Sequence, residues 1–180
     1  FEGCAQLTSV TLTAEVVYSK AFLNCTGLEE IKLDGTKFIN SNVFQGCISL
    51  TSVTVPASVI ALKAEAFKDC TRLETAEVNV GNLNGTVSSS GTAGNGWFKG
   101  CTSLKSVTFA DGLLRLENYL FEGCTSLTTI KLPATLQRLS AGYGAFKNCT
   151  SLVSLTIPAG VTAIENNEFV GCASLKEIIF

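Results

Sequence analysis

The sequence Phe121-Glu122-Gly123-Cys124-Thr125-Ser126-Leu127 recurs, with variations, throughout this chain of 180 residues. Its skeleton is a phenylalanine, a cysteine three residues later and a leucine three residues after that. Successive cysteines are separated by 21, 22, 23, 31, 23, 25 and 23 residues. All eight cysteines fit the pattern: Cys4, Cys25, Cys47, Cys70, Cys101, Cys124, Cys149 and Cys172. The chain is therefore an internal repeat with a period of about 23 residues.

The residue before each cysteine is always glycine, asparagine or aspartate. These positions are Gly3, Asn24, Gly46, Asp69, Gly100, Gly123, Asn148 and Gly171. Only these residue types tolerate the left-handed backbone region readily. The pattern predicts a tight turn with positive φ in every repeat.

A short segment of alternating polar and apolar residues follows the leucine, as in residues 9–12, 30–33, 52–55 and 129–132. Such alternation is typical of a half-buried strand. The three prolines, Pro56, Pro133 and Pro158, each come directly after such a segment. We expect proline to end the strand there without removing an interior hydrogen bond.

A weaker set of apolar pairs, spaced by three residues, lies between each strand and the next phenylalanine. The pairs are Val59 and Leu62, Leu113 and Leu116, Leu136 and Leu139, and Val161 and Ile164. This spacing fits a second short extended or 3₁₀-like segment. A single coil of this kind cannot bury its apolar side, whereas stacked coils can.

The predicted fold is a repeat solenoid, a right-handed superhelix of the leucine-rich-repeat type that is rich in β-structure. Its parallel sheet lies on the concave side, and short strand or 3₁₀ segments lie on the convex side. Residues 1–180 form one domain of about eight repeats in this prediction.

Stacked equivalent cysteines point in parallel, so their Cβ vectors do not converge as a disulfide requires. A column also fails to place four thiolates around one zinc ion. We therefore expect free, buried thiols that donate weakly to turn carbonyls, with no metal and no other cofactor.

The unit F-x-[GND]-C-x-x-L-x-x-[IV]-x-[LIVF]-P resembles the BspA-like leucine-rich repeat over essentially the whole chain. The stretch from Cys149 through Leu152 to Pro158 is equally similar. The departures are Asp34 in place of proline, Ala76 at a strand core position and a long insertion. The resemblance implies a secreted or surface-exposed bacterial or protozoan protein that mediates adhesion. It also implies protein ligands, including host extracellular matrix proteins, and no enzymatic activity.

Composition excludes several functions. The formal net charge is −2, so no basic field is available for nucleic acid or an anionic membrane. Histidine is absent, which excludes histidine-based nucleophile systems and imidazole metal ligands. The carboxylates of Glu65, Glu117, Glu165 and Glu168 are expected on the solvent side of turns, without a catalytic pair.

No apolar run is long enough for a membrane span, and no signal peptide is recognisable. Methionine is absent, and both ends begin or stop within the repeat without a polar cap. We expect the chain to be a segment of a longer protein.

The polar strand residues should face solvent on the concave side of the sheet. Their columns are mostly serine and threonine with few charges, which suits either a solvated sheet or a broad, shallow protein contact. The candidate binding residues on this face are Glu30, Lys32, Thr54, Glu77, Lys105, Thr108, Lys131 and Thr156.

Two irregularities of the repeat are further candidates. Residues 81–96 form a Gly/Ser/Asn-rich insertion that ends at Trp97, the only tryptophan. This insertion is either a functional loop or a tolerated excursion with Trp97 covering the core. A two-residue expansion around residues 142–144 would display Tyr143.

We therefore expect a non-catalytic extracellular or cell-surface module that binds protein through its concave face. The first alternative is a structural spacer that presents other domains. A carbohydrate-binding module is a weaker alternative, because aromatic side chains are missing from the concave columns.

Overall fold

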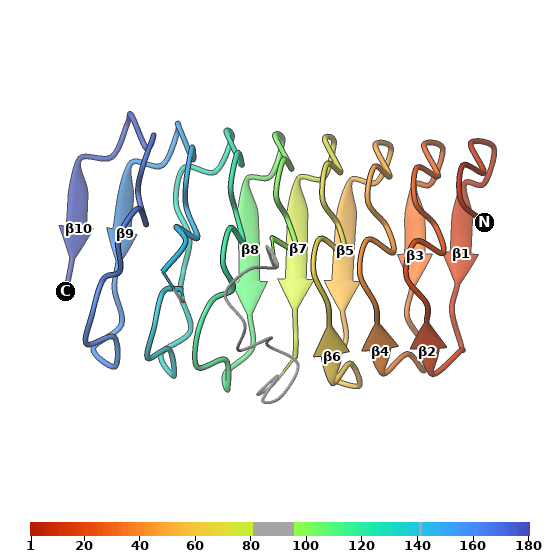
Figure 1. The fold of residues 1–180 in the computed structure, drawn as a ribbon, viewed down its shortest axis with the longest axis horizontal. Helices are drawn as coiled ribbons and strands as arrows, with labels where there is room; N and C mark the ends of the chain where they lie inside the picture. The colour runs from red at the N-terminus through yellow and green to blue at the C-terminus, as the bar shows by residue number, and fades with distance from the viewer. Residues whose placement is uncertain (81–95, 141) are drawn as a thin grey trace.

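In the computed structural model, which describes residues 1–80, 96–140 and 142–180, the chain forms a parallel β-solenoid (Figure 1). We number its coils by their phenylalanines, from Phe1 in coil 1 to Phe169 in coil 8. In Figure 1 the coils stack along the long axis of the molecule, with the N- and C-termini at opposite ends. The fold class predicted from the sequence is confirmed.

The longer strands form the front face of the solenoid. They are β1 (Ser9–Thr11), β3 (Glu30–Lys32), β5 (Ser52–Val55), β7 (Thr75–Val78), β8 (Ser106–Phe109), β9 (Ser154–Thr156) and β10 (Glu177–Ile179). Each pairing is parallel and joins equivalent residues of neighbouring coils, as in Thr54 opposite Glu77 and Glu77 opposite Thr108. Apolar side chains of these strands point inward and polar ones outward, as the alternation predicted.

Shorter strands form the back face and run in the opposite direction (Figure 1). They are β2 (Val16–Val17), β4 (Phe38–Ile39) and β6 (Ala61–Leu62), which pair in parallel in that order. An isolated bridge between Arg115 and Arg138 continues this row. The sequence allowed either an extended or a 3₁₀-like segment on the back face. The described residues contain the extended form and no 3₁₀ helix.

Two consecutive turns explain the spacing of phenylalanine, cysteine and leucine. In coil 6 the Cys124 N–H donates to the Phe121 carbonyl at 3.0 Å, and the Leu127 N–H donates to the Cys124 carbonyl at 3.2 Å. Gly123, which lies between Phe121 and Cys124, has a φ of 77°. All eight residues before the cysteines have positive φ, between 56° and 79°, so this prediction is confirmed.

The same turns hold neighbouring coils together. The N–H of the left-handed residue donates to a carbonyl of the following coil, as in Gly100 to Glu122 and Gly123 to Lys147. The N–H of the preceding phenylalanine does likewise, as in Phe98 to Leu120. The turn therefore provides a ladder of backbone hydrogen bonds between coils that is separate from both sheets.

The phenylalanine side chains stack along the core. Ring centroids of neighbours lie between 5.2 Å, for Phe1 and Phe22, and 6.1 Å, for Phe98 and Phe121. The rings from Phe44 to Phe146 in this column are fully buried. Each buried ring contributes about 1.5–3 kcal/mol through the hydrophobic effect.

The cysteines form a column of free thiols beside these rings. From Cys25 onward, each Sγ donates to the phenylalanine carbonyl of the preceding coil, as in Cys124 to Phe98 at 3.2 Å and Cys149 to Phe121 at 3.1 Å. The carbonyl of Phe121 thus accepts both from the Cys124 N–H and from the Cys149 thiol. The expected buried thiols that donate to turn carbonyls are confirmed.

The prolines interrupt the front sheet, contrary to our interpretation of the sequence. In coils 4 and 5 the equivalent residues donate to the preceding coil, from Asn79 to Val55 and from Ala110 to Val78. Proline has no N–H to donate. Among the described residues, no β-bridge joins β3 to β5, and none joins residues 129–132 to β8 or β9. Each gap lies between a proline-containing coil and the coil before it.

The predicted strand at residues 129–132 is therefore wrong. This segment lacks a regular hydrogen-bond partner on both sides. Pro133 has no N–H to donate to β8 in the preceding coil, and Pro158 of the next coil has no N–H to donate to this segment. Its side chains still alternate, with Ile130 and Leu132 buried and Lys131 exposed.

The buried thiols predict a loss of stability at alkaline pH. Burial raises the pKa of Cys124 well above its ordinary value of 9.0, so the folded state holds a proton that the unfolded state releases above about pH 9. The stability that depends on this proton is complete below pH 9 and falls as pH rises, by up to about 1.4 kcal/mol per pH unit per thiol. Between pH 8 and pH 10, the free energy of unfolding of Cys124→Ser should therefore fall by about 1 kcal/mol less than that of the wild type.

The measurement is urea unfolding at pH 8, 9 and 10. Cys4 is exposed, so Cys4→Ser serves as the control and should keep the wild-type pH dependence. An unchanged pH dependence in Cys124→Ser would contradict the assignment of a protonated, buried thiol.

The glycines before the cysteines predict a second effect. A Cβ at Gly100 would collide with the Asp69 Oδ1 of the preceding coil, whereas a Cβ at Gly123 meets only Gly100, at 3.8 Å. Both positions have positive φ, which costs about 1–2 kcal/mol for alanine. Gly100→Ala should therefore destabilise the fold by about 1 kcal/mol more than Gly123→Ala.

The test is a double-mutant cycle by chemical denaturation. Asp69→Gly should remove the additional cost of Gly100→Ala and leave the cost of Gly123→Ala unchanged. Equal costs of the two alanine substitutions would refute the steric explanation.

Candidate functional site

The outward side chains of the front strands form a continuous polar surface, which we call the front face. Residues predicted as candidates are exposed on it in consecutive coils. They are Glu30, Lys32, Thr54, Glu77, Lys105, Thr108, Lys131 and Thr156. The strand register places Thr54, Glu77 and Thr108 side by side in one row.

Some charged groups on the front face pair with one another. Glu30 and Lys32 form an ion pair at 3.1 Å, and Glu74 and Lys105 form one at 2.9 Å. The Thr54 hydroxyl donates to Glu77 at 3.3 Å. These contacts are solvent-exposed, so each stabilises the fold by well under about 1 kcal/mol and leaves the groups accessible.

Two grooves open on the front face at gaps in the sheet. One, of about 360 Å³, lies between β3 and β5 and includes Glu29, Lys32, Asp34 and Thr54 in its walls. The other, of about 580 Å³, lies between β8 and residues 131–134. Its walls combine Thr108 and Lys131 with apolar Phe109 and Leu132. Both grooves adjoin a proline, Pro56 and Pro133, so the missing backbone bond and the groove share one cause.

The structure excludes Trp97 as a surface ligand-binding residue. Its side chain is only 1% exposed, because it occupies the core position that alanine, valine or leucine takes before phenylalanine in most coils. This corrects its inclusion among the candidates and agrees with the alternative that Trp97 covers the core. Residues 81–95 of the predicted insertion lie outside the described residues. Tyr143 is 43% exposed, as the sequence suggested.

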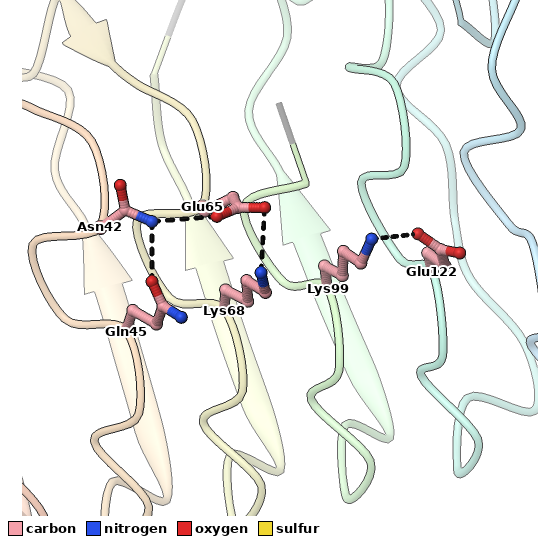
Figure 2. A network of polar contacts seen from close by, with 6 residues as sticks. All are labelled: Asn42, Gln45, Glu65, Lys68, Lys99 and Glu122. Atoms are coloured by element: carbon pink, nitrogen blue, oxygen red, sulfur yellow. Dashed lines mark hydrogen bonds and ion pairs between the residues drawn. The ribbon is translucent and has the colours of Figure 1, made fainter. Parts of the chain in front are cut away.

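A ladder of polar side chains, which sequence reasoning missed, runs along the turns away from the front face (Figure 2). Asn42 donates to Gln45 and to Glu65, and Glu65 pairs with Lys68 at 3.1 Å. Lys99 pairs with Glu122 at 2.7 Å in the same row. The signal in the sequence was the column after phenylalanine, where Gln45, Lys68, Lys99, Glu122 and Lys147 follow one another.

Glu122 is the centre of the strongest part of this ladder. Its carboxylate lies between Lys99 and Lys147, 2.7 Å and 3.1 Å from their ammonium groups, and its side chain is only 14% exposed. Burial opposes ionisation, but the two ion pairs outweigh it and hold the pKa of Glu122 below its usual range. The bond to Glu122 raises the pKa of Lys99 in turn. Both shifts favour the charged forms of Glu122 and Lys99.

Two carboxylates that the sequence placed on the solvent side of turns are buried. Glu117 is 5% and Glu168 is 2% exposed. Glu168 accepts hydrogen bonds from the Ser140 hydroxyl and from the Ala145 N–H. Burial raises the pKa of Glu168, although both hydrogen bonds oppose this shift. The expectation failed because turn position alone does not show which way a side chain points.

Within the described part of the chain, no group of three or more histidine, cysteine, aspartate or glutamate side chains is arranged to hold a metal ion. No helix in that part is long and apolar enough to cross a lipid bilayer.

The stacked parallel coils, the repeated turn and the ordered columns define a leucine-rich-repeat solenoid. The family model for the BspA-type leucine-rich repeat region, of six copies, matches residues 1–90 and again residues 91–180. The chain belongs to this family. Leucine-rich repeats are in general scaffolds for protein binding.

Solved structures of bacterial repeat proteins are similar. A leucine-rich repeat protein from Eubacterium ventriosum superposes with a TM-score of 0.78 at 25% identity, over 94% of this chain and 44% of that one. A leucine-rich cell surface protein from Faecalibacterium prausnitzii gives 0.60 at 21% identity, over 99% of this chain and 61% of that one. A leucine-rich repeat protein of T. pallidum gives 0.63 at 24% identity, over 95% and 73%.

The chain therefore spans less than two thirds of the length of the E. ventriosum and F. prausnitzii proteins. No relative was found among curated proteins.

The grooves predict that removing a proline closes the sheet. Pro133→Ala supplies an N–H at position 133. In the preceding coil the equivalent residue is Ala110, whose N–H donates to the Val78 carbonyl. The N–H at position 133 should bond to the Phe109 carbonyl and exchange with solvent about fivefold more slowly than an unbonded amide, since one net hydrogen bond is worth about 1 kcal/mol. Hydrogen exchange by NMR measures this amide directly, with the Ala110 amide as the bonded reference. An amide of residue 133 that exchanges as freely as a solvent-exposed one would contradict our explanation of the groove.

Proposed function

We propose that this chain is a non-catalytic binding module, at the cell surface or secreted, that holds a protein ligand on its front face. The observation that supports this most directly is the row of exposed side chains held in register from coil to coil by parallel strand pairing. Backbone hydrogen bonds in the sheet and in the turns fix the spacing of these side chains, so a ligand meets a preorganised surface.

The charge distribution on the front face specifies the ligand further. Acidic residues predominate on coils 2 and 4, at Glu29, Glu30, Asp34, Glu74 and Glu77, with Lys32 among them. Lysines predominate on the later coils, at Lys105, Lys131 and Lys176, where Asp111 and Glu177 are the exposed carboxylates. A protein with the opposite polarity along its contact surface is therefore favoured, because complementary potentials steer association and fix orientation.

The absence of large aromatic residues among the named front-face candidates favours a broad contact over a small pocket. Strong hot spots are enriched in tryptophan, tyrosine and arginine, whereas threonine and serine contribute little individually. The ligand would therefore need a wide footprint, of about 800 Å² on this chain for a stable complex. An extended protein of the extracellular matrix, or another surface protein, supplies such a footprint.

The proposed surface location is supported by one similar structure, which is described as a leucine-rich cell surface protein. Free thiols do not conflict with an oxidising exterior here, because six of the eight cysteines are buried and donate to carbonyls.

Charge reversal on the front face tests the proposal. We expect the wild-type chain to bind at least one member of a panel of immobilised extracellular matrix proteins saturably. The double substitution Lys105→Glu/Lys131→Glu should weaken that binding about tenfold or more, because it places two repulsive charges opposite the acidic part of the ligand. Biolayer interferometry at two salt concentrations is the measurement.

The matched control is Lys37→Glu. Lys37 is an exposed lysine that pairs with Glu15 beside the back strands. Equal loss of binding in this control, or saturable binding that ignores the front-face reversal, would exclude the front face. Absence of any saturable binding, with binding by other parts of the full-length protein, would instead favour a structural spacer.

A further inference from the structure

Two irregularities of the repeat meet beside Tyr119 on the turn side of the later coils. Tyr119 itself has the left-handed backbone, with a φ of 57°, that Lys20 and Glu65 have at the equivalent position. Tyr143 lies in the two-residue expansion beside Gly142, which has a φ of 107°. Gly96, where the insertion rejoins the coil, approaches so closely that a Cβ there would lie 2.9 Å from the Tyr119 carbonyl.

The two tyrosines form a small aromatic surface. Their ring centroids are 5.5 Å apart and tilted by 37°, and the Tyr119 N–H donates to the Tyr143 carbonyl at 3.1 Å. Tyr143 is 43% exposed, so part of its ring is open to a ligand. Tyr119 is half-buried beneath it.

Two lysines complete the cluster. The Lys99 ammonium lies 5.3 Å and the Lys147 ammonium 6.0 Å from the centroid of the Tyr119 ring. Glu122 holds both lysines in place, yet their side chains remain 36% and 37% exposed. Each ammonium has three N–H donors, so each retains donors for a ligand after its bond to Glu122.

We propose that Tyr119, Tyr143, Lys99, Lys147 and Glu122 form a binding site for an acidic saccharide that carries a hexuronate. The exposed tyrosine ring packs against the apolar C–H face of a pyranose, and the lysine ammonium groups donate to the carboxylate and the ring hydroxyls. The five side chains carry two positive charges and one negative charge, so an anionic sugar is favoured over a neutral one.

The size of the cluster argues against a protein at this site. Five side chains from a few neighbouring turns cover far less than the roughly 800 Å² per partner of a standard protein interface. A small, partly aromatic surface with convergent polar groups is instead typical of small-ligand sites.

Isothermal titration calorimetry of the whole chain with defined oligosaccharides tests this site. The probes are a hyaluronan hexasaccharide and a galacturonate hexamer, with chitohexaose as the neutral counterpart. We expect at least one acidic hexamer to bind saturably and chitohexaose to bind at least about tenfold more weakly, which corresponds to about 1.4 kcal/mol. Raising the salt concentration from 0.05 M to 0.5 M should weaken the acidic ligand further.

Two variants and two controls locate the binding. Tyr143→Ala and Lys147→Gln should each weaken binding about fivefold or more. Tyr18→Ala removes an exposed tyrosine far from the site, and Lys37→Gln removes an exposed lysine, and both should bind as the wild type. Thermal unfolding of all variants verifies that they are folded.

The front-face double substitution Lys105→Glu/Lys131→Glu should leave saccharide binding unchanged, so failure of one proposal does not imply failure of the other. No saturable binding of either acidic hexamer, equal binding of chitohexaose, or equal losses in the Tyr18 and Tyr143 variants would overturn the assignment.

Discussion

The phenylalanine carbonyl of each turn is the point on which the rest of this solenoid depends. The carbonyl of Phe121 accepts the Cys124 N–H within its own coil and the Cys149 thiol from the next coil. The first bond fixes the tight turn, and the second positions the next turn above it. Once consecutive turns superpose, the phenylalanine rings stack and the front strands meet in register. Cysteine suits this position because it is small and apolar and still donates one weak hydrogen bond.

This hierarchy explains what the sequence could predict. The turn depends on residues within a few positions of one another and recurs eight times, so its columns, its positive φ and the buried thiols could be inferred from the pattern. The effect of Pro133 could not, because it depends on which neighbouring coil the missing N–H would face. Burial of Glu168 could not be predicted either, because it depends on the direction of a side chain at a position where most coils have an apolar residue. The pairs of Glu122 join residues of three different coils in a column that has no constant residue type.

The hydrogen bonds of the turns and of the back strands are separate from those of the front sheet. The front face can therefore stay rigid although its sheet is interrupted. The front sheet is broken between β3 and β5, yet across the same two coils the Asn24 N–H still donates to the Gln45 carbonyl and β4 still pairs with β6. A missing proline N–H therefore opens the sheet locally without separating the coils. The result is a surface whose side-chain rows are fixed by the turns and whose grooves are placed by Pro56 and Pro133. Both properties favour ligand binding, because a rigid surface loses little conformational entropy on association.

Position-specific chemistry in a repeat scaffold arises where one coil departs from the others. A left-handed residue before phenylalanine is not by itself such a departure, since Lys20, Asn42, Glu65 and Asn167 share this conformation. Asparagine or glycine would serve the fold at least as well at position 119, because a bulky residue with positive φ costs about 1–2 kcal/mol. The tyrosine there coincides with an expansion that exposes Tyr143 and with two lysines held by one carboxylate. A requirement of the stack alone would recur in every coil, so this coincidence in one place indicates a ligand rather than a structural role.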